Sequence, residues 1–120
     1  MALKVKRVYE AAAKGDGMRI LVDRLWPRGI SKEKATIDLW LKEIAPSNTL
    51  RKRFHAKPEK WDDFLRGYAD ELKSDEATEA AKELRRYIRK GTVTLLYAAK
   101  DQEHNNAVAL KTLLTRRSRK

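Results

Sequence analysis

An apolar run that passes directly into a cluster of charged and aromatic side chains is the feature that most limits how this chain can fold. Residues 20–22, Ile-Leu-Val, have the composition of a strand covered on both faces. Asp23, Arg24, Trp26 and Arg28 follow at once. Guanidinium groups and an indole are costly to bury without partners. We therefore expect a buried strand over about residues 19–25 that ends in a binding site.

Hydrophobic spacing predicts further elements on both sides of this strand. Another strand is expected over residues 5–9, and a central strand over residues 92–98, where apolar and β-branched side chains dominate. The first predicted helix runs from a cap at Ser31 to about Ile44, and the second begins at Ser47 or Asn48. Two more are predicted at residues 61–72 and at residues 77–90, the latter ending before Gly91. Asp101 is expected to cap a last helix. The link between the first two strands is too short for a parallel crossover, so they are either antiparallel neighbours or separated within the sheet.

Length and composition limit the class of protein. A chain of 120 residues has the size of one domain, which we expect over residues 1–115, followed by a basic tail at residues 116–120. Cysteine is absent, which excludes disulfides, thiolate metal ligands and a thiol nucleophile. No apolar run has the length of a membrane span or the form of a signal peptide. We expect a soluble cytoplasmic protein without a membrane partner.

The chain carries 28 Lys and Arg against 17 Asp and Glu, a formal net charge of +11. Such a charge attracts polyanions. Part of it lies in the predicted tail and part on predicted helices at residues 51–53 and 85–90, where solvated faces are the simpler interpretation. Neither an aromatic RNA-stacking motif nor zinc-finger spacing accompanies the charge. Nucleic-acid association through the tail and the basic helices is kept as the alternative function.

Polar residues also follow the predicted central strand. If this strand pairs in parallel with the strand at residues 19–25, their carboxyl ends meet at one edge, which is where open α/β sheets bind ligands. A crevice there would bring together the candidate ligand-binding residues Asp23, Arg24, Trp26, Arg28, Lys100, Asp101, Asn105 and Asn106. We predict that this crevice binds a small anionic ligand, phosphate-bearing or nucleotide-like.

Each of these side chains has a chemical reason to be there. Arg24 and Arg28 could hold a phosphate or carboxylate through paired hydrogen bonds, and Lys100 could add a point charge. Trp26 could stack on a planar ring, and Asp23 could orient an arginine. The structural alternative is that Asp23 pairs with an arginine to fix the loop and that Trp26 closes the edge of the core.

Other chemistries leave weaker signals. Asp23 and Asp101 could act as general acid and base or hold magnesium, but no second clustered carboxylate and no dedicated nucleophile is recognisable. His55 and His104 lack a metal-binding spacing, so we predict neither a metal nor a cofactor. The sequence leaves open whether the protein is an enzyme.

Two tyrosines and one further function complete the candidates. Tyr9 and Tyr97 lie near strand ends, where they either reach the crevice or complete the core.

A non-catalytic interaction module is the third functional alternative, and it would require an exposed apolar patch rather than a charged crevice.

A set of motifs spread over nearly the whole chain resembles the YeaO-like proteins of DUF488, a bacterial domain-of-unknown-function family. The most distinctive is Val-Asp-Arg-Leu-Trp-Pro-Arg-Gly at residues 22–29. The other motifs lie at residues 6–9, 16–17, 40, 46–47, 50–51, 54–55 and 95–100. The resemblance implies a compact three-layer α/β/α domain with a small, largely parallel sheet, in agreement with the predicted elements. It implies no particular activity.

The chain departs from this family at one point. The resemblance implies that longer relatives carry a cysteine-containing segment and then Cys-His-Arg after the late strand. This chain reads Tyr-Ala-Ala-Lys at residues 97–100 and Asn-Asn-Ala at residues 105–107. A thiol or metal role therefore does not carry over to this chain, whereas the shared Asp-Arg element can still define a pocket.

Overall fold

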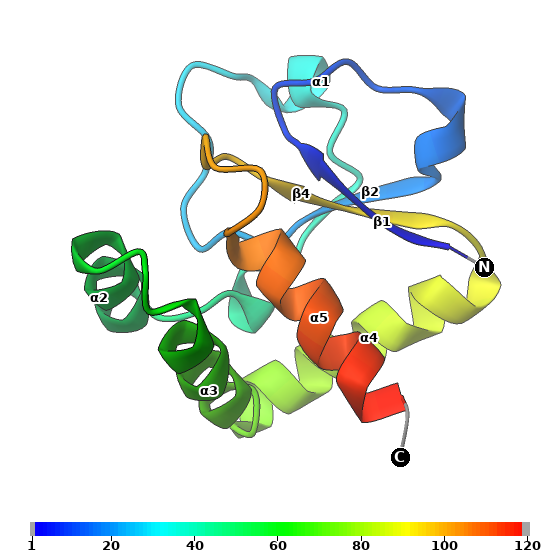
Figure 1. Ribbon diagram of the computed structural model, residues 1–120. Coiled ribbons are helices and arrows are strands. Elements are labelled where there is room, and N and C mark those ends of the chain that lie inside the picture. Colours follow the sequence, from blue (N-terminus) through cyan, green and yellow to red (C-terminus); the bar gives the residue numbers. More distant parts are fainter. Residues whose placement is uncertain (1, 119–120) are drawn as a thin grey trace.

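Four parallel strands form the sheet at the centre of the fold (Figure 1). The computed structural model describes residues 2–118. The strands are β1 (Leu3–Arg7), β2 (Met18–Leu21), β3 (Leu39–Trp40) and β4 (Val93–Tyr97), in the spatial order β1-β4-β2-β3. Every residue of β4 is buried, because this strand lies between β1 and β2. The central strand that was predicted over residues 92–98 is thus confirmed.

The first two strands of the chain are not neighbours, which decides a point that the sequence left open. Leu95 of β4 pairs with Val5 of β1 on one side and with Ile20 of β2 on the other. The chain must therefore pass close to the start of β4 on its way from β1 to β2. Gly17 makes this possible: it has φ +62°, and a Cβ on it would lie 2.1 Å from the carbonyl oxygen of Thr92.

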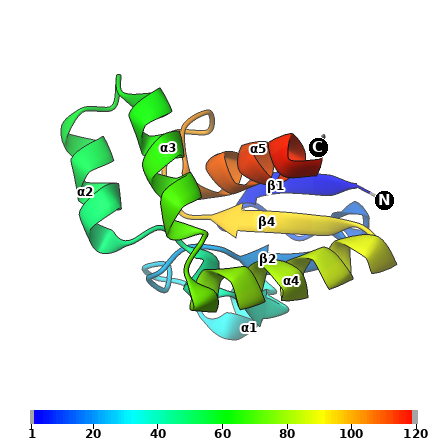
Figure 2. The ribbon, with the colours of Figure 1, turned by 90° about the horizontal axis from the view of Figure 1, so that it is seen from below.

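Helices cover the sheet unequally (Figure 1). On one face lie α4 (Asp75–Lys90) and α5 (Asn106–Ser118), with α3 (Trp61–Glu71) packed beside them. The other face is covered by the short helix α1 (Lys32–Ala35) and by loops. The remaining helix, α2 (Asn48–Ala56), pairs with α3 beyond the carboxyl ends of the strands (Figure 2). The predicted α/β/α architecture with a small parallel sheet is confirmed, with a thin third layer.

The two faces of β4 carry different cores. Side chains of alternate residues, including Leu95 and Tyr97, join a large cluster with the apolar faces of α3, α4 and α5. On the opposite face Leu96 joins Leu21 of β2 and Ala35 of α1 in a smaller cluster. Tyr97 therefore completes the core, which is one of the two roles considered for it.

A buried ion pair fixes the segment before β2. Arg19 is 2% exposed, and its guanidinium donates to Asp16 Oδ2 at 2.5 Å and to the carbonyl oxygens of Ala35 and Thr36 at 3.1 and 2.9 Å. Burial by itself raises the pKa of Asp16, but hydrogen bonds from the Ala13 N–H, Arg19 and Lys6 outweigh it, so this pKa lies below its ordinary value. The pair ties β2 to the end of α1.

The helix predicted from Ser31 to about Ile44 is wrong beyond its first turn. Ser31 caps α1 as predicted, since its hydroxyl accepts from the Lys34 N–H. The helix then stops at Ala35 because Thr36 takes a left-handed conformation with φ 50°. The chain continues as β3, which the sequence analysis missed, and as a 3₁₀ turn at Lys42–Ile44. Its apolar residues pack on β2 rather than along a helical face.

The remaining boundaries agree more closely. The helices predicted at residues 61–72 and 77–90 correspond to α3 and α4, and Gly91 follows α4. Ser47 caps α2. The strands predicted at residues 5–9 and 19–25 lie instead at Leu3–Arg7 and Met18–Leu21. The backbone of α5 continues through residues 116–118 of the predicted tail, whereas residues 119–120 lie outside the described part of the chain.

No helix within residues 2–118 is both long and apolar enough to cross a membrane.

Candidate functional site

The carboxylate of Asp23 joins three elements at the carboxyl ends of the strands. Asp23 follows β2, and its Oδ2 accepts from the backbone N–H of Ala98, which follows β4, at 2.9 Å. Its Oδ1 accepts from Nδ2 of Asn106, the first residue of α5, also at 2.9 Å. The predicted convergence of the β2 and β4 loops at one edge is therefore present, and Asp23 is what holds them together.

Burial dominates the titration of this carboxylate. It raises the pKa of Asp23, against the opposing effects of the Ala98 N–H, the Asn106 amide and the charge of Arg51 on α2. Arg51 was not predicted as a site residue. Its position within a basic triplet at residues 51–53 gives no local signal that distinguishes it from its exposed neighbours. It brings a compensating positive charge to this edge of the sheet.

Arg24 points towards the start of α2. Its Nη2 donates to the carbonyl oxygen of Ala45 at 2.9 Å and its Nε to that of Pro46 at 3.2 Å. Carbonyl oxygens at a chain turn are satisfied in this way by a donor with a fixed planar geometry. The structure therefore uses Arg24 as a tie between the loop after β2 and the segment before α2.

A second clamp, which the sequence analysis missed, holds the same segment from the other side. The backbone N–H and the hydroxyl of Ser47 donate to the two carboxylate oxygens of Glu71 at 2.7 and 2.6 Å, while the hydroxyl also accepts from the Leu50 N–H. Ser47 was predicted as a helix cap, but nothing in the sequence pairs it with Glu71, which lies 24 positions later. Arg24 and Glu71 together fix the entry to α2.

Trp26 packs against the smaller core. Its ring meets that of Trp40 edge-on with centroids 5.4 Å apart, and its Nε1 donates to the Ile30 carbonyl oxygen at 2.8 Å. The Nε1 of Trp40 donates to the backbone oxygen of Asp23 at 2.7 Å. Both indoles are half-buried. The arrangement fits the structural alternative for Trp26, in which the indole closes the edge of the core.

Arg28 and Lys100 are two cations at this edge whose side chains stay exposed. Within residues 2–118 neither side chain forms a hydrogen bond or an ion pair. Arg28 is held through its backbone, because its carbonyl oxygen accepts from the Tyr9 hydroxyl at 3.0 Å. Tyr9 follows β1 and is 43% exposed. Arg28 is thereby anchored beside the end of β1, and Lys100 lies three positions beyond the end of β4.

The loop that carries Lys100 is fixed by Arg7 at the end of β1. Its guanidinium donates to the carbonyl oxygens of Ala98 and Ala99 at 3.1 and 2.9 Å and lies 4.9 Å from the centre of the Tyr9 ring. Arg7 was not among the predicted site residues, although it belongs to the motif at residues 6–9. This side chain orders the residues next to Lys100.

Asp101 shapes the approach to α5 without capping it, which corrects the predicted helix start. Its Oδ1 accepts from the N–H groups of Glu103 and His104 at 2.9 and 3.1 Å, and these bonds lower the pKa of Asp101. The cap of α5 is Asn105, whose Oδ1 accepts from the Val108 N–H at 2.9 Å. Local spacing misleads here because Asp101 caps a tight bend five residues ahead of the helix.

The predicted set of side chains thus divides into two groups. Arg28 and Lys100 face solvent, whereas the side chains of all the others, Asp23, Arg24, Trp26, Asp101, Asn105 and Asn106, form contacts within the protein. Within residues 2–118 no group of three or more His, Cys, Asp or Glu side chains is placed to hold a metal ion. The exposed pair can attract an anion by charge and donate hydrogen bonds to it.

Sequence comparisons find relatives over nearly the whole chain. A family model described as "Inactive DUF488-N3 subclade" matches residues 2–120. The chain is 46% identical over 110 residues to the uncharacterized protein YeaO of Escherichia coli, covering 92% of this chain and 94% of that protein. It is 40% identical over 115 residues to an uncharacterized protein of Mycobacterium tuberculosis, covering 96% of this chain and 95% of that protein. No solved structure gives a significant match.

Proposed function

The chain belongs to the DUF488 family, and we propose that it binds a small phosphate-bearing anion at the carboxyl edge of the sheet, with Arg28 and Lys100 as the contacting cations. One observation carries the proposal. Two exposed cations without protein partners within residues 2–118 lie on loops that follow strands at the same edge of a parallel sheet. Ligands of open α/β sheets bind at that edge.

Preorganisation of the loops supports the same proposal. The Asp23 carboxylate holds the β4 exit to the β2 exit, the Tyr9 hydroxyl holds the backbone of Arg28, and Arg7 holds the residues before Lys100. A site whose backbone is already fixed loses less entropy when a ligand binds. Arg28 and Lys100 need to order only their side chains, so a small anion can be bound with few contacts.

The proposal concerns binding rather than catalysis. The carboxylates of Asp23 and Asp101 each accept two hydrogen bonds from within the protein, so both have a structural role in the loops that carry them. The word "inactive" in the description of the matching subclade favours binding rather than catalysis. A cytoplasmic location fits a small phosphate-bearing ligand and remains a prediction from the sequence.

Thermal denaturation with matched ligands tests the proposal. A ligand that binds only the folded state at 100 times its dissociation constant adds about 2.7 kcal/mol of stability, which raises Tm by several degrees. We expect ribose 5-phosphate and AMP to raise Tm, and uncharged ribose at the same ionic strength to leave it unchanged. The double variant Arg28→Gln/Lys100→Gln should lose the response.

The control variant is Lys90→Gln, which removes an exposed cation at the end of α4, near the amino end of β4. It should keep the full response to both phosphates. Equal responses in the double variant and the control would refute the assignment of Arg28 and Lys100, and no response of the unmodified protein to either phosphate would refute the choice of ligand.

The net charge of +11 favours nucleic-acid association as the second candidate function. This function predicts binding whose affinity falls steeply with salt, because each phosphate contact releases a counterion. Removing residues 115–120 should flatten the salt dependence. Failure to bind DNA or RNA near physiological salt would eliminate this candidate.

A further inference from the structure

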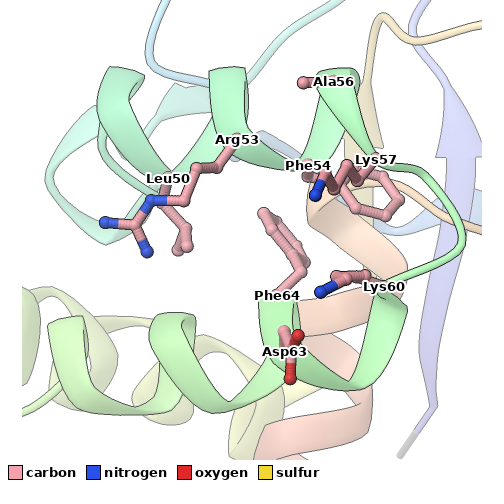
Figure 3. A pocket seen from close by; sticks show the side chains of 8 residues that line it. All are labelled: Leu50, Arg53, Phe54, Ala56, Lys57, Lys60, Asp63 and Phe64. Atoms are coloured by element: carbon pink, nitrogen blue, oxygen red, sulfur yellow. The ribbon is translucent and has the colours of Figure 1, made fainter.

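A cavity of about 410 Å³ lies between α2 and α3 (Figure 3). Its volume is within the range of small-molecule sites. Leu50, Phe54 and Phe64 supply its apolar surface, of which Leu50 and Phe64 are buried and Phe54 is half-buried. The rings of Phe54 and Phe64 are 4.9 Å apart. The aromatic surface that a flat apolar group can reach in the cavity is therefore mainly that of Phe54, whose ring packs against the buried Phe64.

Cations surround this apolar surface. The exposed side chains of Arg53, Lys57 and Lys60 line the cavity together with one carboxylate, Asp63 (Figure 3). The three cations form no side-chain hydrogen bond or ion pair within the described chain, whereas Asp63 is already paired with Arg66. The charge offered to a ligand is thus positive.

The two helices are fixed relative to each other, so the cavity is part of the fold. A Cβ on Gly67 of α3 would lie 2.7 Å from Cδ1 of Leu50 on α2, which shows how closely the helices approach. Trp61 at the start of α3 adds ring contacts with Phe54 and Phe64, each with centroids 5.4 Å apart. This packing fixes the backbone positions from which the lining side chains project.

We propose that the α2–α3 cavity is a second binding site, which takes a small aromatic anion: a flat apolar body with one carboxylate or phosphate group. The aromatic body packs against Phe54, and its anionic group lies among Arg53, Lys57 and Lys60. Binding needs both apolar contact and charge. The cationic groups are exposed, so water and salt weaken their attraction for an anion, and charge by itself gives little affinity.

Isothermal titration calorimetry with matched probes tests this site. 1-Naphthyl phosphate and 1-naphthaleneacetate supply the two anionic groups, 1-naphthylmethanol removes the charge, and inorganic phosphate removes the apolar body. We expect both aromatic anions to bind with a 1:1 component at least tenfold tighter than either control compound. Similar affinity for 1-naphthylmethanol would overturn the proposal, because the cavity would then be an apolar surface without anion selectivity.

Matched variants locate the binding. Lys57→Gln/Lys60→Gln should weaken binding of 1-naphthyl phosphate at least tenfold, whereas Lys52→Gln/Lys90→Gln, which removes two exposed cations outside the cavity, should change it less than twofold. Arg28→Gln/Lys100→Gln should also leave it unchanged, which separates this site from the strand edge. Equal weakening by both lysine pairs would overturn the proposal, since it would indicate attraction to the overall charge.

A single-stranded oligonucleotide serves as the competing ligand. We expect it to leave the affinity for 1-naphthyl phosphate within twofold at physiological salt. Displacement of the probe by the oligonucleotide, with an affinity that falls steeply as salt increases, would overturn the proposal and identify the α2–α3 surface as a nucleic-acid contact.

Discussion

Replacing Asp23 tests whether its carboxylate holds the β2 and β4 loops together. Asp23→Ala leaves the Ala98 N–H and the Asn106 amide without their acceptors. An unsatisfied, partly buried donor costs about 1–3 kcal/mol, and relief of the burial cost of the carboxylate offsets part of two such losses. We expect Asp23→Ala to lower the free energy of unfolding by about 2 kcal/mol.

Asp23→Asn is the matched control because it keeps the shape. The new amide oxygen can accept from the Ala98 N–H, while Asn106 can turn its amide so that its own oxygen accepts from the new amide nitrogen. This rearrangement keeps a hydrogen bond from residue 23 to Ala98 and another to Asn106, which is half-buried and can place its own amide N–H groups towards water. We expect a loss of less than about 1 kcal/mol.

The pH dependence of the same pair of proteins gives an independent test. The folded-state pKa of Asp23 is raised above its ordinary value of 3.8, so the folded protein holds this proton more tightly than the unfolded chain does. The stability of the unmodified protein relative to Asp23→Asn should therefore fall as pH rises from 3.8 through the raised pKa, and be constant above it. Urea denaturation at a series of pH values measures this difference.

Two results would refute the reasoning about Asp23. Equal unfolding free energies for the Ala and Asn variants would show that the two hydrogen bonds do not stabilise the fold. A stability difference between the unmodified protein and Asp23→Asn that grows with rising pH would show that the folded state favours the ionised carboxylate.

Three further substitutions test the scaffold around the site. Arg24→Gln should lower the free energy of unfolding by about 1–3 kcal/mol in urea denaturation, yet leave the affinity of ribose 5-phosphate within twofold, because the guanidinium binds carbonyl oxygens rather than ligand. Gly17→Ala should cost several kcal/mol or prevent folding, as seen by circular dichroism, since its Cβ would lie 2.1 Å from the Thr92 oxygen; a stability within about 1 kcal/mol of the original would contradict this close approach. Asp16→Asn should cost about 3 kcal/mol at neutral pH by leaving a buried guanidinium unpaired. The folded-state pKa of Asp16 is lowered, so the stabilisation by its carboxylate is present above pH 3.8 and is lost as pH falls through the lowered value. The free energy of unfolding should therefore decrease less at acid pH in Asp16→Asn than in the unmodified protein.

The central strand and the long helices could be predicted because their signals are local. The apolar run at residues 93–97 and the periodic faces of α3 and α4 each depend on a short window of sequence. The region between Thr36 and Trp40 could not be read in this way. Its form depends on a left-handed residue and on pairing with β2, and a two-residue strand has no period to detect.

The sequence was enough to predict where the loops after β2 and β4 meet, but not which of their side chains form contacts within the protein and which stay exposed. Parallel pairing of the strands predicted at residues 19–25 and 92–98, once assumed, was enough to place Asp23 and Asn106 at one edge, and Asn106 Nδ2 donates to Asp23 Oδ1 there. Arg24 and Arg28 are chemically identical in the sequence. Only the fold shows that carbonyl oxygens at residues 45–46 lie beside Arg24, while none lies within hydrogen-bonding distance of the Arg28 side chain among the described residues.

Hydrogen bonds between residues far apart in the sequence could not be predicted either, because they depend on the fold rather than on local patterns. Glu71 accepts from Ser47 across 24 positions, and Arg7 binds carbonyl oxygens more than 90 positions away. Such contacts follow from the parallel order β1-β4-β2-β3, which local patterns left undecided.

Chemical-shift mapping tests most directly the claim that exposed cations at the carboxyl edge bind an anion while Asp23 and Arg24 hold the scaffold. The ¹⁵N-labelled protein is titrated with ribose 5-phosphate at constant ionic strength, and the backbone amides are followed individually. We predict saturable shifts that cluster around Arg28 and Lys100 and disappear in Arg28→Gln/Lys100→Gln. Shifts that rise without saturation, or that cluster on residues remote from this edge, would contradict the claim.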